Sequence, residues 1–151
     1  MGTYRSSDGG TTFSTQSTTP NILSSDAAAT GTSGQAGHDL AIAVSPANAN
    51  LLTIGGISQW RSTDGGVTWT ILTYWYGTDP LNAGGTPGIA PYLHADVQYI
   101  EYLPGSSTTL FSSCDGGISR STDHGVSWTY IANNLRIAQQ TDVALSSMMP
   151  F

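Results

Sequence analysis

Apolar and polar residues alternate with the two-residue period of β-strands along most of the chain. The run LAIAV (40–44) precedes Pro46, and the run LLTIGG (51–56) follows a turn rich in Ala and Asn. The same arrangement returns around Pro104, and no segment shows helical periodicity with capping residues. The pattern therefore predicts an all-β chain, with strands at 39–45, 50–56, 58–63, 67–73, 97–103, 108–114, 117–122 and 126–132.

One short motif occurs three times, as RSSDGGTTF (5–13), RSTDGGVTW (61–69) and RSTDHGVSW (120–128). Its aspartates are Asp8, Asp64 and Asp123, which lie 56 and 59 residues apart. The second and third copies each sit between the third and fourth strands of a four-strand unit. Four-stranded antiparallel units that repeat along a chain are typical of β-propeller blades.

The blade pattern divides the chain into parts of one propeller domain. Residues 1–19 supply the last two strands of a blade, residues 37–75 and 94–132 are full blades, and 76–93 form a long loop between them. Residues 141–151 begin another blade with a strand at 141–147. Two complete and two partial blades form an incomplete ring, because propellers close with roughly four to eight blades. The sequence therefore predicts partners, either the remainder of a longer propeller chain or copies of itself.

A structural role is predicted for the repeated motif, as a hairpin turn. Its Asp can accept hydrogen bonds from the N–H groups of its own turn, its Ser can add a hydroxyl bond, and Gly66 and Gly125 can take positive φ. The aromatic residue that ends each copy is expected to pack between neighbouring blades. The residues assigned this role are Ser6, Asp8, Gly10 and Phe13; Ser62, Asp64, Gly66 and Trp69; and Ser121, Asp123, Gly125 and Trp128.

The pattern S-x-D-x-G-x-T-W resembles the Asp-box, or BNR repeat, of sialidases, sortilin-type propellers and xyloglucan-cleaving glycoside hydrolases. Ser127 in place of Thr and Phe13 in place of Trp are the departures. The stretch DLAIAVSPANANLLTIGGISQWRSTDGG (39–66) is most similar to sortilin-like propellers of secreted bacterial proteins. The resemblance implies a propeller fold but no single function, since both enzymes and binding proteins carry the motif.

Charge and composition narrow the class of partner. The net charge of −6, with four arginines and no lysine, argues against nucleic acid. No apolar run is long enough for a membrane span. The many Ser, Thr and Gly residues favour an extracellular or cell-surface location. Cys114 is the single cysteine, interpreted as a half-buried thiol in a strand or as a cross-link to another chain.

Five polar residues are expected at one mouth of the propeller channel: His38, Asp39, His94, Asp96 and Asp115. Carboxylates and imidazoles that converge there could act as acid and base, with Asp39 and Asp96 as catalytic candidates. They could equally cap backbone N–H groups before strands. No zinc-type spacing is present, and no metal or cofactor is predicted beyond a cation that could bind near Asp96. The arginines of the repeated motif lie far from this mouth, which argues against a sialidase site.

The long link brings Tyr74, Trp75, Tyr76 and Tyr92 to the same mouth. Their rings could stack on sugars, or they could cover the blade ends as a local core. We therefore expect an extracellular propeller segment that acts as a binding or structural module, for a glycan, a protein partner or copies of itself. The alternatives are a fragment of a xyloglucanase-like glycoside hydrolase and a filament-forming subunit.

Overall fold

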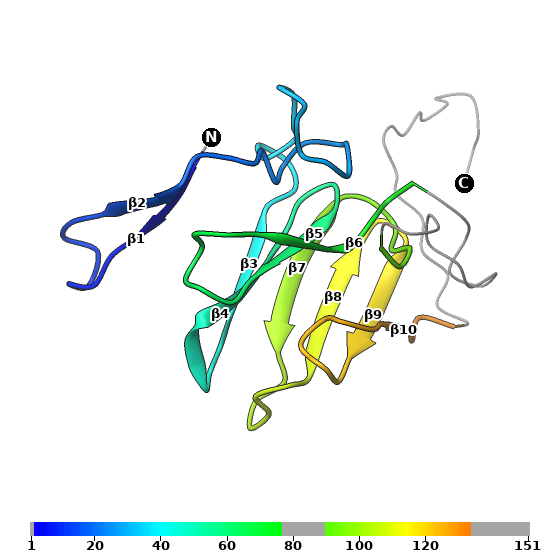
Figure 1. The fold of residues 1–151 in the computed structure, drawn as a ribbon. Coiled ribbons are helices and arrows are strands. Elements are labelled where there is room, and N and C mark those ends of the chain that lie inside the picture. Colours follow the sequence, from blue (N-terminus) through cyan, green and yellow to red (C-terminus); the bar gives the residue numbers. More distant parts are fainter. Residues whose placement is uncertain (1, 77–89, 134–151) are drawn as a thin grey trace, which may run out of the picture.

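The computed structural model describes residues 2–76 and 90–133, and this part of the chain contains strands and no helix (Figure 1). The expected loop 76–93 lies mostly outside it, as does the expected start of a blade at 141–151. A two-stranded hairpin comes first, followed by two four-stranded antiparallel sheets in simple up-and-down order. The strands are β1 (Thr3–Arg5) and β2 (Ser14–Ser17); β3 (Ala41–Ser45), β4 (Asn48–Gly55), β5 (Gln59–Ser62) and β6 (Thr70–Thr73); and β7 (Val97–Tyr102), β8 (Leu110–Cys114), β9 (Gly117–Ser121) and β10 (Thr129–Tyr130).

These sheets confirm the predicted all-β architecture of propeller-type blades, and they do not close a ring. The hairpin β1–β2 carries the first copy of the repeated motif between its two strands, as β5–β6 and β9–β10 carry the second and third copies. The last strand of each full sheet is shorter than predicted, because β6 begins at Thr70 and β10 at Thr129. The residues just before them belong to the turn, where the carboxylate of Asp64 accepts the N–H groups of Val67 and Thr68.

The two four-stranded sheets pack face to face around a shared core. Alternate residues of β3, Ala41 and Ala43, join a buried cluster with Val97 and Ile100 of β7. Gln59 of β5 is completely buried, and its side-chain amide donates to the hydroxyl of Ser112 in β8 at 2.9 Å. This buried hydrogen bond joins the sheets at one point and adds to their apolar contact.

A second core covers the opposite face of the first sheet. Ile22 and Leu23, from the segment between β2 and β3, pack on Ile54 and Trp60. Trp69 packs against the same cluster, and its indole N–H donates to the hydroxyl of Ser17 in β2 at 3.2 Å. The predicted strands did not include this covering segment, because its apolar residues lack the two-residue period.

The aromatic residues that end the repeated motif follow the expectation in two copies and depart from it in the third. Trp69 lies against the core between hairpin and first sheet, and Trp128 lies against the core between the two sheets. Phe13 was expected to pack between blades in the same way, but it is 65% exposed. The reason is that no described sheet packs on the outer side of the β1–β2 hairpin.

Within residues 2–76 and 90–133, no helix is long and apolar enough to cross a membrane.

Candidate functional site

The three repeated turns share one hydrogen-bond network. In the second copy, Ser62 donates its hydroxyl to Asp64 at 2.7 Å and accepts the N–H of Gly66 at 2.8 Å. The Asp64 carboxylate also accepts the N–H of Thr68 at 2.9 Å and its hydroxyl at 2.6 Å. The turns at Asp8 and Asp123 repeat these bonds.

Glycine is required at one position of each turn, since φ is 95° at Gly66 and 85° at Gly125. Bonds from Thr12, first its hydroxyl and then its N–H, hold the pKa of Asp8 at about 2. Burial raises the pKa of Asp123, but hydrogen bonds from Ser127 and Ser121 outweigh it and leave the value at about 2. A carboxylate that accepts this many bonds is poorly suited to carry a proton in a reaction near neutral pH.

A fourth turn of the same kind lies in the segment between β2 and β3, at residues 24–31. Ser24 donates to Asp26 at 2.6 Å, and the carboxylate of Asp26 accepts the N–H groups of Thr30 and Gly31. These bonds, led by that from Ser24, lower the pKa of Asp26 well below its ordinary value. This turn was not predicted from the sequence, although its Ser, Asp and Thr have the spacing of the three recognised copies, in which the last position is Thr or Ser.

Asp39 and Asp96, the two catalytic candidates, lie close enough for their charges to interact. Asp39 is only 1% exposed, and neither of its carboxylate oxygens has a hydrogen-bond partner among the described residues. Burial raises the pKa of Asp39, and the charge of Asp96 raises it further. Asp96 has a φ of 63°, and its carboxylate accepts a long bond of 3.4 Å from the side chain of Gln35. Asp39 is thus a carboxyl group whose pKa its surroundings raise, in contrast to the hydrogen-bonded carboxyl groups of the turns.

The remaining polar candidates are distributed around this pair. His38 is exposed next to Asp39, and His94 is exposed before β7. The ring of His94 lies against Gly116, so a side chain at position 116 would collide with it, and this contact brings His94 next to the turn that holds Asp115. Among the residues the structure describes, no three His, Cys, Asp or Glu side chains converge as they do around a metal ion.

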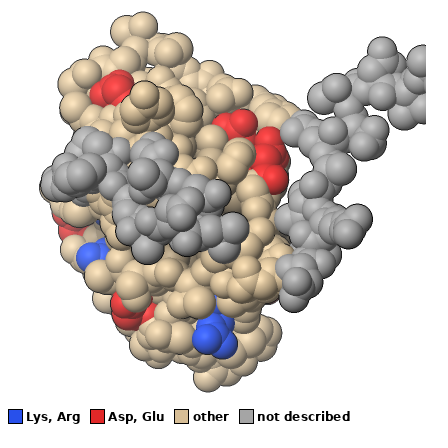
Figure 2. All heavy atoms as spheres, turned by 90° about the vertical axis from the view of Figure 1, so that its right-hand side faces the viewer, with Lys and Arg blue, Asp and Glu red and all other residues tan. Residues whose placement is uncertain are grey.

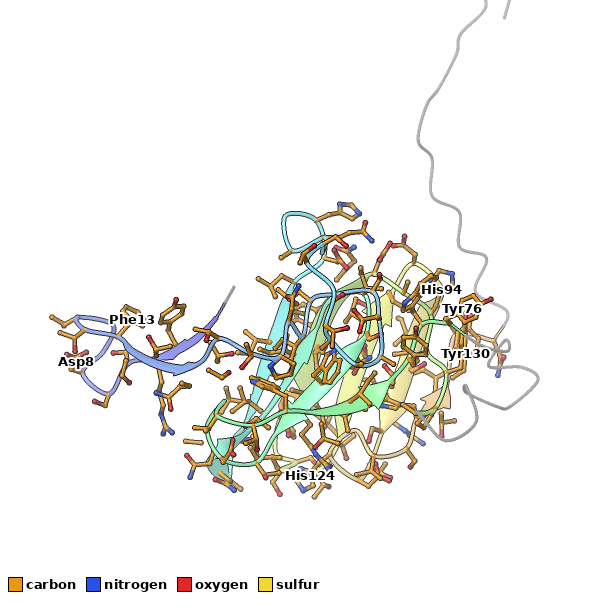
Figure 3. The ribbon with its side chains drawn as sticks, turned by 45° about the horizontal axis from the view of Figure 1, so that its top comes forward. Asp8, Phe13, Tyr76, His94, His124 and Tyr130 are labelled. Atoms are coloured by element: carbon orange, nitrogen blue, oxygen red, sulfur yellow. The ribbon has the colours of Figure 1, made fainter. Side chains whose placement is uncertain are left out.

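Tyr130 is a residue of this end of the molecule that the sequence analysis did not select. Its hydroxyl donates to the carbonyl oxygen of Gly116 at 3.1 Å, beside the ring of His94. Figure 3 shows Tyr76, His94 and Tyr130 at one end of the molecule, while His124 of the third repeated turn lies elsewhere. This contact depends on the register in which β10 pairs with β9, and the composition of the chain does not predict that register.

The expected aromatic residues form a connected row after β6. The rings of Tyr74 and Trp75 meet edge to face at 6.3 Å, and those of Trp75 and Tyr76 at 5.6 Å. The indole N–H of Trp75 donates to the carbonyl oxygen of Ser25 at 2.6 Å, which anchors the row on the segment that carries the fourth turn. Tyr92 is paired with Tyr74 in an isolated parallel bridge. Tyr76 ends the row and is 65% exposed.

The cysteine is half-buried at the end of β8, as one of the two interpretations expected. Burial raises the pKa of the Cys114 thiol, with smaller contributions from nearby charges that include Asp96. The thiol is therefore protonated at neutral pH and is a weak nucleophile.

Acidic and basic side chains are both sparse on the surface drawn in Figure 2, where the acidic ones form small patches. The described residues visible there include isolated arginines and no continuous basic surface.

Comparison with known proteins gives one kind of match. No protein-family model matches the chain, and no curated protein is similar to it. Among solved structures, the chain resembles a GH74 enzyme from Niastella koreensis, with 24% sequence identity and a TM-score of 0.47. The match covers 85% of this chain but 18% of that enzyme, so the chain spans less than a fifth of its length. A similarity of this degree does not identify an activity.

Proposed function

We propose that this chain is an extracellular β-propeller segment of the Asp-box type that binds glycans through the aromatic row at one end. The observation that carries the proposal is the fixed, exposed ring of Tyr76. It packs on Trp75, whose indole N–H is held at 2.6 Å by the carbonyl oxygen of Ser25. A ring that contacts a neighbouring aromatic ring and remains 65% exposed offers a sugar a flat apolar surface.

The neighbouring polar groups suit a ligand rich in hydroxyls. His94 and Asp115 belong to the same end of the second sheet, and Asp96 and Gln35 lie near the start of β7. Glycan sites combine apolar stacking with a few oriented donors and acceptors of this type. The repeated turns support the fold in this proposal and take no part in binding, since their carboxylates are already saturated with hydrogen bonds.

The test compares two equally exposed aromatic side chains. Tyr76→Ala should weaken binding to the best ligand on a glycan array by about fivefold, because a stacking contact is worth roughly 1 kcal/mol. Phe13→Ala is the matched control, since Phe13 is also 65% exposed but lies on the β1–β2 hairpin. Isothermal titration would measure both variants. Equal affinity for the wild type and Tyr76→Ala would refute a site at this row.

A second candidate function is glycoside hydrolysis, favoured by the raised pKa of Asp39 beside Asp96. Glycosidases pair a carboxyl that keeps its proton with one that is ionised. Because Asp39 is buried, a substrate would have to reach this pair of carboxyl groups from the side of Asp96. Release of reducing ends from plant or microbial polysaccharides, abolished in Asp96→Asn, would establish this candidate. Unchanged hydrolysis in that variant would exclude Asp96 as catalytic.

A further inference from the structure

The carboxyl group of Asp39 is buried directly before the first strand of a sheet and lacks a partner. Asp39 is 1% exposed, and neither of its carboxylate oxygens accepts a hydrogen bond from the described residues. Its own N–H donates to the carbonyl oxygen of Gln35 at 3.1 Å, so the turn before β3 fixes the backbone and leaves the carboxyl group unsatisfied. An ionised carboxyl group is stable in such a place only when another group compensates its charge.

The charged side chain that acts most strongly on Asp39 is a second acid. Burial has the largest effect and raises the pKa of Asp39, and the charge of Asp96 raises it further. A hydrogen bond between the two carboxyl groups adds a smaller rise in the same direction, so the groups face each other. The exposed imidazole of His38 opposes the rise more weakly. Two facing carboxyl groups repel each other unless a proton or a cation lies between them.

The other donors around this pair are uncharged oxygens. The side-chain amide of Gln35 lies 3.4 Å from Oδ1 of Asp96, and rotation of that amide presents its oxygen in place of its nitrogen. Asp96 is half-buried, so water can reach the pair from its side. The nearby thiol of Cys114 donates to the carbonyl oxygen of Gly117, and burial raises its pKa, so it is a poor metal ligand at neutral pH.

This donor set matches one kind of metal ion. Carboxylate, amide and water oxygens are the ligands of calcium, which accepts roughly six to eight of them in irregular geometry. Zinc prefers thiolates and imidazoles, and magnesium demands a near-ideal octahedron. We propose that Asp39 and Asp96 bind one calcium ion, with the side-chain oxygen of Gln35 as a further ligand.

The proposed ion connects the two four-stranded sheets. Asp39 precedes β3 of the first sheet, and Asp96 precedes β7 of the second. At the same place the N–H of Val97 donates to the carbonyl oxygen of Gly56 at 2.9 Å, so the ion adds a second link between the sheets. Both carboxyl groups are ionised when they hold calcium. The ion and the acid–base role considered above for this pair therefore exclude each other.

Titration calorimetry of calcium chloride into chelator-treated full-length protein tests binding. Wild type should bind calcium with a Kd of about 10⁻⁴–10⁻³ M, the range of extracellular calcium modules. Asp39→Asn and Asp96→Asn should each weaken binding by at least about tenfold, because each removes a charged ligand. Glu101→Gln is the charge-matched control, since Glu101 is exposed in β7, and it should keep the Kd of the wild type.

Thermal unfolding at pH 7 distinguishes a bound cation from a shared proton. Without calcium, Asp39→Asn should melt above wild type, because it removes a buried charge. Calcium at about ten times its Kd should raise the melting temperature of wild type by about 3–8 °C and leave that of Asp39→Asn unchanged. The higher melting temperature shows that the variant is folded although it does not bind.

Three results would overturn the proposal. A wild type that shows neither heat of binding nor a shift at millimolar calcium would mean that a proton lies between the two carboxyl groups. An equal calcium-dependent shift in Asp39→Asn would place the ion elsewhere. An equal shift of the wild type in magnesium chloride would mean that divalent ions screen the net charge of −6 and do not fill a calcium site.

Discussion

The carboxyl groups of Asp39 and Asp64 show how strongly local surroundings decide what one residue type can do. Asp64 accepts bonds from three residues of its own turn, led by Thr68, and its pKa is held well below the ordinary value. The carboxylate of Asp39 is buried and has no hydrogen-bond partner among the described residues, and its pKa is raised by burial and then by Asp96. The repetition of Asp64 along the chain reflects its structural role. The perturbed Asp39 is the better candidate for chemistry or for binding.

Neutralising Asp39 should stabilise the protein at neutral pH. The folded state raises the pKa of this group above 3.8, so the unfolded chain loses the proton first as pH rises. The free energy of unfolding therefore falls as pH rises from 3.8 to the pKa of Asp39 in the folded protein, and this loss of stability is complete above that pKa. Asp39→Asn removes that loss, so its melting temperature should exceed that of wild type at pH 7, and the difference should shrink as pH falls through this range and be lost below pH 3.8. A less stable variant at pH 7 would mean that the ionised carboxylate has a partner.

At the scale of elements, the repeated turns were predictable and their surroundings were not. The spacing of Ser, Asp, Gly and Thr specifies a local network, so the sequence predicted its position and its type in three copies. The turn at Asp26 was missed because it has no glycine two residues after the Asp, and its positive φ lies at Ala29, one residue further on. The anchoring of Trp75 on Ser25 could not be predicted, since it joins segments 50 residues apart.

The repeated turn should contribute more to stability between β5 and β6 than in the β1–β2 hairpin. Asp64→Ala should lower the melting temperature by several degrees, because it leaves the N–H groups of Val67 and Thr68 without acceptors beside the packed Trp69. Asp8→Ala removes matching bonds from the exposed β1–β2 hairpin and should cost less. Differential scanning calorimetry would rank the two. Glycan affinity should be retained in both variants, and its loss with an unchanged melting curve would assign the turn a binding role.

For the whole molecule, the sequence predicted two complete blades from the shared order of strands, Pro46 or Pro104 and the repeated motif. It did not predict how the sheets meet, because the contact depends on distances between separate elements. The backbones of the two sheets meet where β4 ends. The N–H of Val97 donates to the carbonyl oxygen of Gly56 at 2.9 Å, which ties the first residue of β7 to the end of the first sheet.

The absence of a side chain at Gly55 is what permits this approach. A Cβ there would lie 2.5 Å from Cγ1 and 2.7 Å from Cβ of Val97, which is 1% exposed. Gly55→Ala should therefore push the sheets apart and destabilise the protein by about 1–3 kcal/mol, the usual cost of overpacking. Chemical denaturation followed by tryptophan fluorescence would measure the loss of stability.

Val97→Ala provides the partner variant for a double-mutant cycle. By itself it should also destabilise the protein, because it leaves a cavity in the core shared by the two sheets. Combined with Gly55→Ala, it removes Cγ1 of Val97, the atom nearest the new Cβ, while Cβ of residue 97 remains close, so the double variant should lose less stability than the sum of the single variants. Strict additivity would mean that Gly55 is required for its backbone conformation alone. A loss of stability smaller than the sum of the two single variants would mean that glycine is required at position 55 for the contact between the two sheets, the contact that determines how they stack.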